Sequence, residues 1–192
     1  MHTFRQFIHQ YVLLSDKDWA QIEPCLVKKE VTSNTLLLEE GKICRHLYFL
    51  EQGLLRFFIL KNGNDITKFF TDTAYALTSQ NSFANQVPAK ESIETLEDCV
   101  LWQMTHEDVY RLLENNRWSE FVRKLVQEVQ FFTEEILEEM QTETAENRYK
   151  LILDNNPTLL QRVPLKHLAS YLGIAQQSLS RIRKNIQSER RI

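Results

Sequence analysis

The sequence predicts an α+β protein: an N-terminal antiparallel β-roll of the jelly-roll type, then a long helix, then an all-helical C-terminal domain. Three observations predict this order. Short β-rich runs between glycine turns fill much of the first half, an unbroken heptad pattern follows, and two short amphipathic segments flank a glycine near the end. We therefore divide the 192 residues into a β-roll sensor domain with flanking helices (1–116), a long helix (117–140) and a C-terminal domain (141–192).

The N-terminal half begins with a helical pattern and then changes to the period of strands. Residues 1 to about 30 are predicted to be helical, with Ser15 as an N-cap. Asn62-Gly63 is typical of a tight hairpin, because the favoured turn needs positive φ at both central residues. The polar segment 71–92 is predicted to be a loop or short helix. Strands are predicted at residues 35–38, 46–50, 54–60, 66–70, 91–96 and 99–104, with a core of Leu47, Phe49, Leu55, Phe57, Ile59 and Phe69.

A single long helix is predicted from Trp118 to Met140. Its apolar residues are spaced alternately by four and three positions, which is the heptad seam of paired helices rather than the broad apolar face of a helix packed on one domain. We expect this seam to pair with a second copy of the chain in a homodimer. The alternative is a helix buried inside a monomer. The seam residues are Trp118, Val122, Leu125, Val129, Phe132 and Ile136.

The segment from Leu165 to Ile186 has the spacing of a helix-turn-helix. Two short amphipathic helices are predicted, and Gly173 lies between them at a turn position where positive φ is needed. The second helix presents side chains of the types that contact base edges and phosphates, so double-stranded DNA is the expected partner. An ordinary helical hairpin is the alternative. The expected DNA-binding residues are Gln176, Gln177, Ser178, Ser180, Arg181, Arg183 and Lys184.

Charge is divided unevenly along the chain. From residue 162 onward the formal charge is +6, whereas the first 161 residues carry −9. A basic unit attached to an acidic body is typical of a nucleic-acid-binding module joined to another domain. The basic residues of this segment are Arg162, Lys166, Arg181, Arg183, Lys184, Arg190 and Arg191.

The sequence has no pattern of an enzyme, a metal site or a membrane span. The five histidines are scattered, and no P-loop, GxGxxG or GxSxG motif occurs. This weighs against the runner-up from another class, a metal-dependent β-barrel enzyme, so we expect no catalysis, cofactor or metal. Three separated cysteines are expected to be reduced and partly buried. With only short apolar runs and no signal-peptide pattern at residues 1–10, the protein is expected in the cytoplasm, away from membranes.

The order of a β-roll, a long helix and a helix-turn-helix resembles the Crp/Fnr superfamily of bacterial transcription regulators. The most specific parts are LASYLGIAQQSLSRIRK (168–184) and the Gly41 and Gly53 turns around LYFLEQG, and the run from AENRYKLIL onward is similar to members from Bacteroidetes. The resemblance implies a homodimeric regulator of a pseudo-palindromic operator, with RNA polymerase as a partner if it activates transcription. It also implies that Gln176, Gln177 and Arg181 read bases and that Ser178 contacts phosphate. Few residues follow this helix, so a C-terminal β-wing is expected to be truncated or absent.

The sensor half departs from the pattern of the cyclic-nucleotide-binding members it resembles. Those members hold the cyclic phosphate with a glycine turn and an arginine, but residues 69–99 contain neither glycine nor arginine. We therefore expect no cAMP binding, or only weak binding. The alternative function is a cyclic-nucleotide- or small-molecule-binding sensor or interaction module with weak or vestigial DNA binding. An unknown small-molecule effector, if one binds, is expected near Phe69, Tyr75, Gln80, Phe83 and Lys90.

Overall fold

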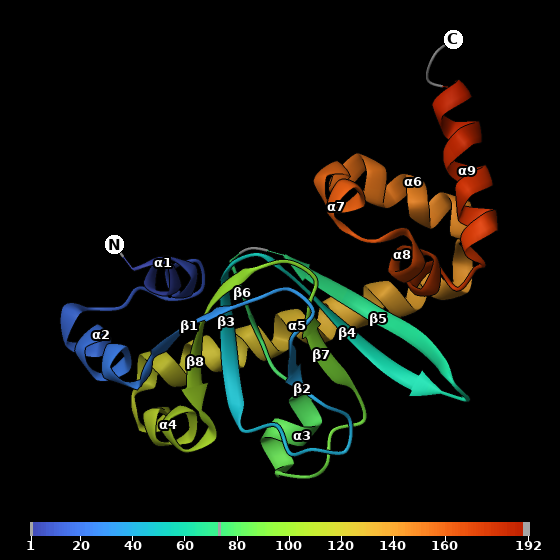
Figure 1. Ribbon diagram of the computed structural model, residues 1–192. Coiled ribbons are helices and arrows are strands. Elements are labelled where there is room, and N and C mark those ends of the chain that lie inside the picture. The colour runs from blue at the N-terminus through green and yellow to red at the C-terminus, as the bar shows by residue number, and fades with distance from the viewer. Residues whose placement is uncertain (1, 73, 190–192) are drawn as a thin grey trace.

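The computed structural model describes residues 2–72 and 74–189 and shows a two-sheet β-roll followed by a helical unit (Figure 1). Both sheets are antiparallel, as predicted, and each has four strands within these residues. One sheet has the strand order β1 (Val27–Val31), β8 (Cys99–Thr105), β3 (His46–Gln52), β6 (Tyr75–Leu77). The other has the order β2 (Leu36–Leu38), β7 (Ser92–Thr95), β4 (Leu54–Lys61), β5 (Asn64–Asp72).

Helices lie before, beside and after the roll. Before it come α1 (Thr3–His9), α2 (Asp16–Ile22) and the 3-10 turn η1 (Glu23–Cys25). Within and after it come α3 (Gln80–Asn85), α4 (His106–Arg111), the 3-10 turn η2 (Leu112–Glu114) and the long α5 (Asn116–Thr142). The chain ends in the C-terminal helical unit, which we define as α6 (Ala145–Asn155), α7 (Pro157–Arg162), α8 (Leu165–Leu172) and α9 (Gln176–Glu189).

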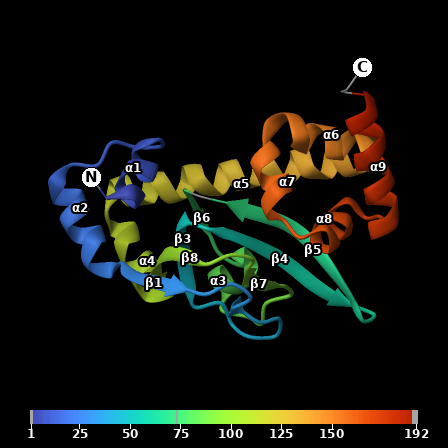
Figure 2. The same cartoon turned by 45° about the horizontal axis from the view of Figure 1, so that its top comes forward.

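The long helix α5 extends from the roll to the C-terminal helical unit. In Figures 1 and 2, α1, α2 and α4 gather around its N-terminal end, and α6–α9 gather at its C-terminal end, beside the β4–β5 hairpin. This hairpin turns at Asn62 and Gly63, whose φ angles are 54° and 78°, and its strands pair from Lys61↔Asn64 onward. Both positive φ angles are those that the Asn-Gly signal predicts.

The interior is built from two apolar clusters. The larger fills the roll and includes Phe4 and Phe7 of α1, Phe49 of β3 and Phe121 of α5. The smaller belongs to the C-terminal helical unit together with Leu54 of β4. Of the predicted core residues, Leu47, Phe49, Leu55 and Phe57 are buried, whereas Ile59 and Phe69 are half-buried.

Strands β3 and β4 are buried on both faces, which period-two alternation does not predict. Phe4 of α1 packs against Phe49 of β3, with ring centroids 4.9 Å apart. Leu54, at the start of β4, is fully buried in the C-terminal cluster. Each strand therefore has a helix or helical unit on the face that an isolated sheet would expose to water.

Two predicted elements differ from the structure. Residues 27–30 were expected to be helical but belong to β1, which pairs with β8 from Val27↔Gln103 to Val31↔Cys99. This segment is a strand because it pairs with another strand some 70 residues later, and the local spacing of apolar residues does not indicate such pairing. The prolines at 157 and 164 predict a short connection over residues 155–164, but this segment contains α7. Pro157 lies in the first turn of α7, where its missing N–H is tolerated, and the Asn156 side chain accepts a hydrogen bond from the Leu159 N–H.

The expected dimer seam needs a correction at its N-terminal end. Trp118 is 0% exposed within the single chain and donates from Nε1 to the Val109 carbonyl at 3.1 Å. Leu125 is also buried, in the same cluster. Since the first third of α5 covers the roll and α1, these two residues belong to the core of one chain and are not available to a second copy.

Gly53 is where the backbone demands glycine most strongly. Its φ is +118°, and an added Cβ would lie 2.4 Å from the Cys99 Sγ and 3.0 Å from the Asp98 carbonyl oxygen. We predict that Gly53→Ala lowers the free energy of unfolding by about 2–4 kcal/mol, because backbone strain adds to overpacking. Urea unfolding measures this.

Gly41→Ala is the matched control. Gly41 also has positive φ, +87°, but no atom lies within 4 Å of the added Cβ. We expect a loss of about 1–2 kcal/mol from the backbone alone. Equal losses in the two variants would show that the contact with Cys99 has no energetic weight.

Candidate nucleic-acid interface

The helices α8 and α9 are joined by a tight turn at Gly173. This residue has φ 72°, and its N–H donates to the Ser170 carbonyl at 3.1 Å. The Ile174 N–H donates to the Ala169 carbonyl at 3.1 Å, so the last carbonyls of α8 are satisfied before the chain turns. The two helices pack through the buried side chains Leu168, Ala169, Leu172, Leu179 and Ile186. The turn and both apolar faces agree with the pattern in the sequence.

The opposite face of α9 is polar and open to water. Arg183, unlike the other basic residues described on this helix, is half-buried. The Ser180 hydroxyl donates to the Gln176 carbonyl of its own helix at 3.1 Å. Arg190 and Arg191 lie outside the described residues. The exposed residues among those predicted to contact DNA are Gln176, Gln177, Ser178, Ser180, Arg181 and Lys184.

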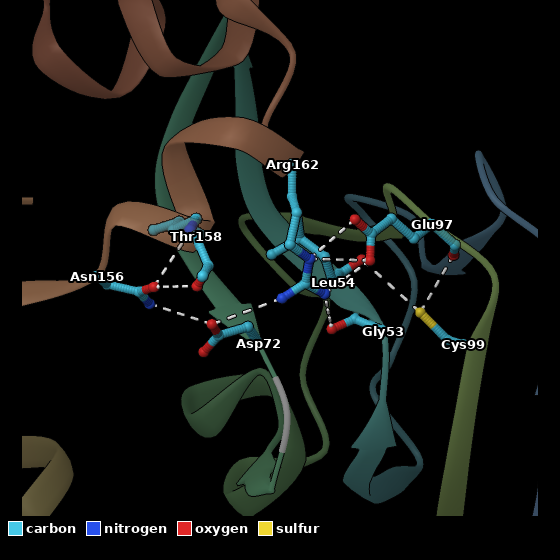
Figure 3. Close-up of polar contacts among 9 residues, drawn as sticks. Gly53, Leu54, Asp72, Glu97, Cys99, Asn156, Thr158 and Arg162 are labelled. Carbon is cyan, nitrogen blue, oxygen red and sulfur yellow. Dashed lines mark hydrogen bonds and ion pairs between the residues drawn. The ribbon is translucent and has the colours of Figure 1, made fainter. Parts of the chain in front are cut away.

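Arg162 does not belong to this open basic face. Its Nε donates to Glu97 Oε1 at 2.9 Å, and one terminal nitrogen donates to Glu97 Oε2 at 2.6 Å and to the Gly53 carbonyl at 2.7 Å. The other terminal nitrogen lies 3.7 Å from Asp72 Oδ2. Figure 3 shows the guanidinium of Arg162 between these three groups. We call this group (Arg162, Glu97, Asp72 and the Gly53 carbonyl) the Arg162 cluster.

The first two helices of the C-terminal unit contact the roll on both sides of the Arg162 cluster. Asn156, between α6 and α7, donates from Nδ2 to Asp72 Oδ2 at 3.1 Å (Figure 3). Leu54 lies among the apolar side chains of the helical unit rather than those of the roll. The unit is therefore packed against β4 and β5 rather than tethered loosely to them.

Helix α8 adds a second set of contacts on β5. The Ser170 hydroxyl accepts from the Thr67 N–H at 2.9 Å and donates to the Asp65 carbonyl at 2.8 Å. The Tyr171 ring lies 5.6 Å from the Phe70 ring and has the Arg148 guanidinium 5.0 Å from its centroid. These contacts attach α8, the helix that precedes the predicted reading helix, directly to strand β5 of the roll.

Beneath α8 a buried arginine links three strands. Arg56 of β4 is 2% exposed and forms ion pairs with Asp65 of β5 and Glu94 of β7. Its guanidinium also donates to the Thr67 hydroxyl. Pairing on two sides satisfies a charge that would otherwise be expensive to bury.

His167 lies on the buried face of α8, near this arginine. Burial lowers the pKa of His167 to about 4, the charges of Arg56 and Lys166 act in the same direction, and Asp65 opposes them. The imidazole is therefore neutral in the folded protein at neutral pH.

The exposed apolar side chains of α5 lie after Leu125 and extend to Met140. Phe132 is 45% exposed, and Val126, Leu137 and Met140 are also exposed. Val122, Val129 and Ile136 are half-buried. Val122 packs against the core of the roll, so three of the six predicted seam residues, Val129, Phe132 and Ile136, remain available to a second copy. Val126, Leu137 and Met140 add exposed apolar side chains to the same helix.

The residues expected near an effector have their contacts on different elements. Phe69 stacks on Phe57 at 4.1 Å, and Phe83 contacts His106 of α4 at 5.1 Å. Burial raises the pKa of Tyr75 to about 12, and a hydrogen bond with Glu128 of α5 acts in the same direction. Gln80 and Lys90 are exposed. These contacts do not define a common binding surface.

Residues 69–99, in which the resemblance implies an anion-binding arginine, contain instead a paired carboxylate, that of Glu91. Glu91 accepts from the Ser79 hydroxyl at 2.5 Å and pairs with Lys68 at 3.0 Å. Lys68 was not among the predicted residues, because it lies on β5, more than 20 positions away in the sequence. The lysine that meets an anion here is thus Lys68, and the anion is Glu91.

Two kinds of site are absent from the part of the chain that the structure describes. No group of three or more His, Cys, Asp or Glu side chains is placed to hold a metal ion there. No helix within residues 2–72 and 74–189 has the length and apolar character needed to cross a bilayer.

Comparison with known proteins finds a matching domain family and solved structures of the same fold. Residues 28–116 match the family model of the cyclic nucleotide-binding domain. Among solved structures, the chain is similar to a protein from Eubacterium rectale assigned to the transcriptional regulators of the Crp/Fnr family, at 17% identity and a TM-score of 0.71, covering 92% of this chain and 85% of that one. No curated protein sequence matches.

Two further structures show the same arrangement. One is CLP of Xanthomonas campestris, described as a c-di-GMP responsive global regulator, at 13% identity and a TM-score of 0.72, covering 91% of this chain and 93% of that one. The other is the catabolite activator protein of Thermus thermophilus, at 17% identity and a TM-score of 0.58, covering 93% and 86%. The chain therefore shares the fold of these regulators, and most of its roll lies within the segment that matches the cyclic nucleotide-binding domain model. The likeness to Bacteroidetes members stays a prediction.

The pKa of His167 is about 4 in the folded protein and about 6.5 in the unfolded chain, so the unfolded chain binds a proton first as the pH falls. The free energy of unfolding is therefore unaffected by this histidine above about pH 6.5 and decreases as the pH falls from 6.5 towards 4. We predict that wild type loses about 2–3 kcal/mol more than His167→Gln between pH 7 and pH 4.5. Urea unfolding at a series of pH values measures the difference, and parallel curves for the two proteins would contradict it.

Proposed function

We propose that this chain is a sequence-specific DNA-binding transcriptional regulator that acts as a homodimer on a pseudo-palindromic operator. The observation that carries the proposal is the outer face of α9, where Gln177, Ser180, Arg181 and Lys184 are all exposed. A helix held by a glycine turn against a packed partner presents such a face to the major groove in helix-turn-helix proteins. The fold shared with Crp/Fnr regulators supports the same function.

Each exposed side chain of α9 has a chemistry suited to DNA. Arg181 can donate two hydrogen bonds to guanine, and the glutamine side chains can pair with adenine. Lys184 and Ser178 suit phosphate oxygens, which position the helix without reading sequence. The Arg162 charge is neutralised by Glu97 and Asp72, so the electrostatic attraction comes from the other basic residues.

The homodimer would form through the part of α5 that follows Leu125. Four large apolar side chains, Val126, Phe132, Leu137 and Met140, are exposed along this one stretch of helix, which apolar residues scattered singly over a monomer do not explain. Pairing this surface with its copy would bury it and place two α9 helices on one face of the dimer. Such a pair reads half-sites about one DNA turn apart.

The proposal assigns no cyclic nucleotide to the roll. A cyclic phosphate needs donors and a positive charge, whereas the corresponding segment presents the Glu91 carboxylate, already bound by Ser79 and Lys68. A second anion beside this carboxylate would meet like-charge repulsion.

Arg181→Ala tests the proposed reading helix. The operator is first selected from random DNA with the wild-type protein, and affinities are then measured by fluorescence anisotropy. We predict at least a tenfold loss of affinity for the selected site, because the variant lacks the bidentate contact in both protomers, with little change in binding to unrelated DNA.

Lys17→Ala is the matched control, since it removes the same charge from an exposed position on α2. It should leave specific affinity within about twofold, as expected for a charge far from the interface. Equal affinity of wild type and Arg181→Ala for the selected site would sink the assignment, as would failure of the wild type to select any sequence.

Phe132→Glu tests the proposed dimer. A carboxylate in the middle of the paired surface would be desolvated, so we predict a monomer at micromolar concentration by analytical ultracentrifugation. Phe131→Glu is the control, because Phe131 is the more exposed of the two, at 59%, but is rotated about 100° away from the seam. The dimer assignment is wrong if both variants, or neither, dissociate.

A further inference from the structure

The C-terminal helical unit is joined to α5 by a very short linker. Helix α5 ends at Thr142 and α6 begins at Ala145, so only residues 143 and 144 lie between them. Apart from this linker, the unit is held by its non-covalent contact with β4, β5 and the turn between β7 and β8, which carries Glu97. This contact therefore bears on the orientation of α6–α9 relative to the roll.

Within this contact the apolar and polar parts have different consequences. Leu54 is 0% exposed and contributes burial, which is non-directional. The Arg162 cluster is partly open, with the Arg162 side chain 27% exposed, and its hydrogen bonds are directional. The apolar part therefore favours docking in general, and the polar part selects one angle of docking.

Arg162 is suited to this selection by its geometry. Its planar guanidinium pairs with both oxygens of Glu97 and also donates to the Gly53 carbonyl, so three acceptors on the roll fix its plane. It is the last residue of α7, and α8 begins three positions later. Ser170 then bonds the middle of α8 to β5.

We propose that Arg162 is a positioning residue, which sets the orientation of α9 relative to the roll through its fork on Glu97 and Gly53. The orientation passes from Arg162 to α8 and then, through the Gly173 turn and the buried Leu172 and Leu179, to α9. Arg162 itself contacts no DNA, because its charge is bound within the protein.

The consequence for DNA rests on the proposed function. In a dimer, the separation of the two α9 helices depends on how each helical unit is docked. A unit held by Arg162 would accept one half-site spacing, and a unit without it would accept several with lower affinity for the best one. Arg162 would thus determine spacing, whereas Arg181 determines base sequence.

The Thr67 amide provides a test that needs no DNA. Its N–H donates to the Ser170 hydroxyl of α8, so its hydrogen exchange reports docking of the helical unit, although Thr67 is distant from Arg162 in sequence. In the full-length protein, we expect Arg162→Ala and Arg162→Lys to speed exchange at Thr67 at least tenfold, as measured by NMR. Lysine keeps the charge but lacks the fork.

Two further variants separate a role in docking from general instability. Arg117→Ala removes an arginine that pairs with Glu120 on α5, away from the contact, and should leave Thr67 exchange unchanged. The exchanged pair Arg162→Glu with Glu97→Arg should restore part of the lost protection. Should Arg162→Ala fail to fold, Glu97→Gln loosens the same fork from the roll side and is expected to speed Thr67 exchange.

A second measurement addresses spacing. The selected operator is compared with versions that carry one extra or one fewer central base pair. Wild type should lose at least tenfold in affinity for the altered versions, and Arg162→Lys should discriminate less than threefold. Unchanged Thr67 exchange in the Arg162 and Glu97 variants, or faster exchange with unaltered spacing preference, would overturn the proposal. Faster exchange in a protein that selects no DNA would instead refute the proposed function and leave the docking role standing.

Discussion

The contact between the β4–β5 hairpin and the C-terminal helical unit holds the two halves of this protein together. Strand β4 serves both cores: Leu54 packs with the helical unit, and Leu55, the next residue, packs inside the roll. Gly53, just before them, fits against Cys99 only because it lacks a side chain, and its carbonyl accepts from Arg162. Residues 53–55 therefore contribute to the core of the roll, to the glycine turn and to the docking of the helical unit at the same time.

The long helix α5 divides its surface between two tasks. Its N-terminal part, with Trp118, Phe121 and Leu125, completes the core of the roll. Its C-terminal part carries Phe132, Leu137 and Met140, which remain exposed in the single chain. A continuous heptad pattern can therefore describe two different environments, because the same apolar spacing serves a fold partner at one end and an open surface at the other.

Charged groups on the sheets, one of them the buried Arg56, are paired within the protein. Arg56 pairs with Asp65 and Glu94 beneath α8, and Glu91 pairs with Lys68 on β5. The Arg56 group carries one more negative than positive charge and the Lys68–Glu91 pair is neutral, so neither attracts an incoming phosphate. The roll has the fold of a cyclic nucleotide-binding domain, but its polar residues are used to stabilise the sheets and the docked helices.

The sequence by itself determined the features that depend on neighbouring residues. Periodicity placed most strands and α5, Asn62-Gly63 placed the hairpin, and Gly173 placed the turn before the exposed face of α9, because each is a local preference of the backbone or of one helical face. Only the tertiary structure decided the features that depend on distant partners. Strand β1 exists because β8 pairs with it, and Arg162 belongs to the docking contact because Glu97, 65 positions earlier, meets it there. Contacts across such separations produce no periodic pattern in a single sequence. The number of basic residues near the C-terminus therefore grouped Arg162 with the predicted DNA-binding residues, although its partners lie on the roll.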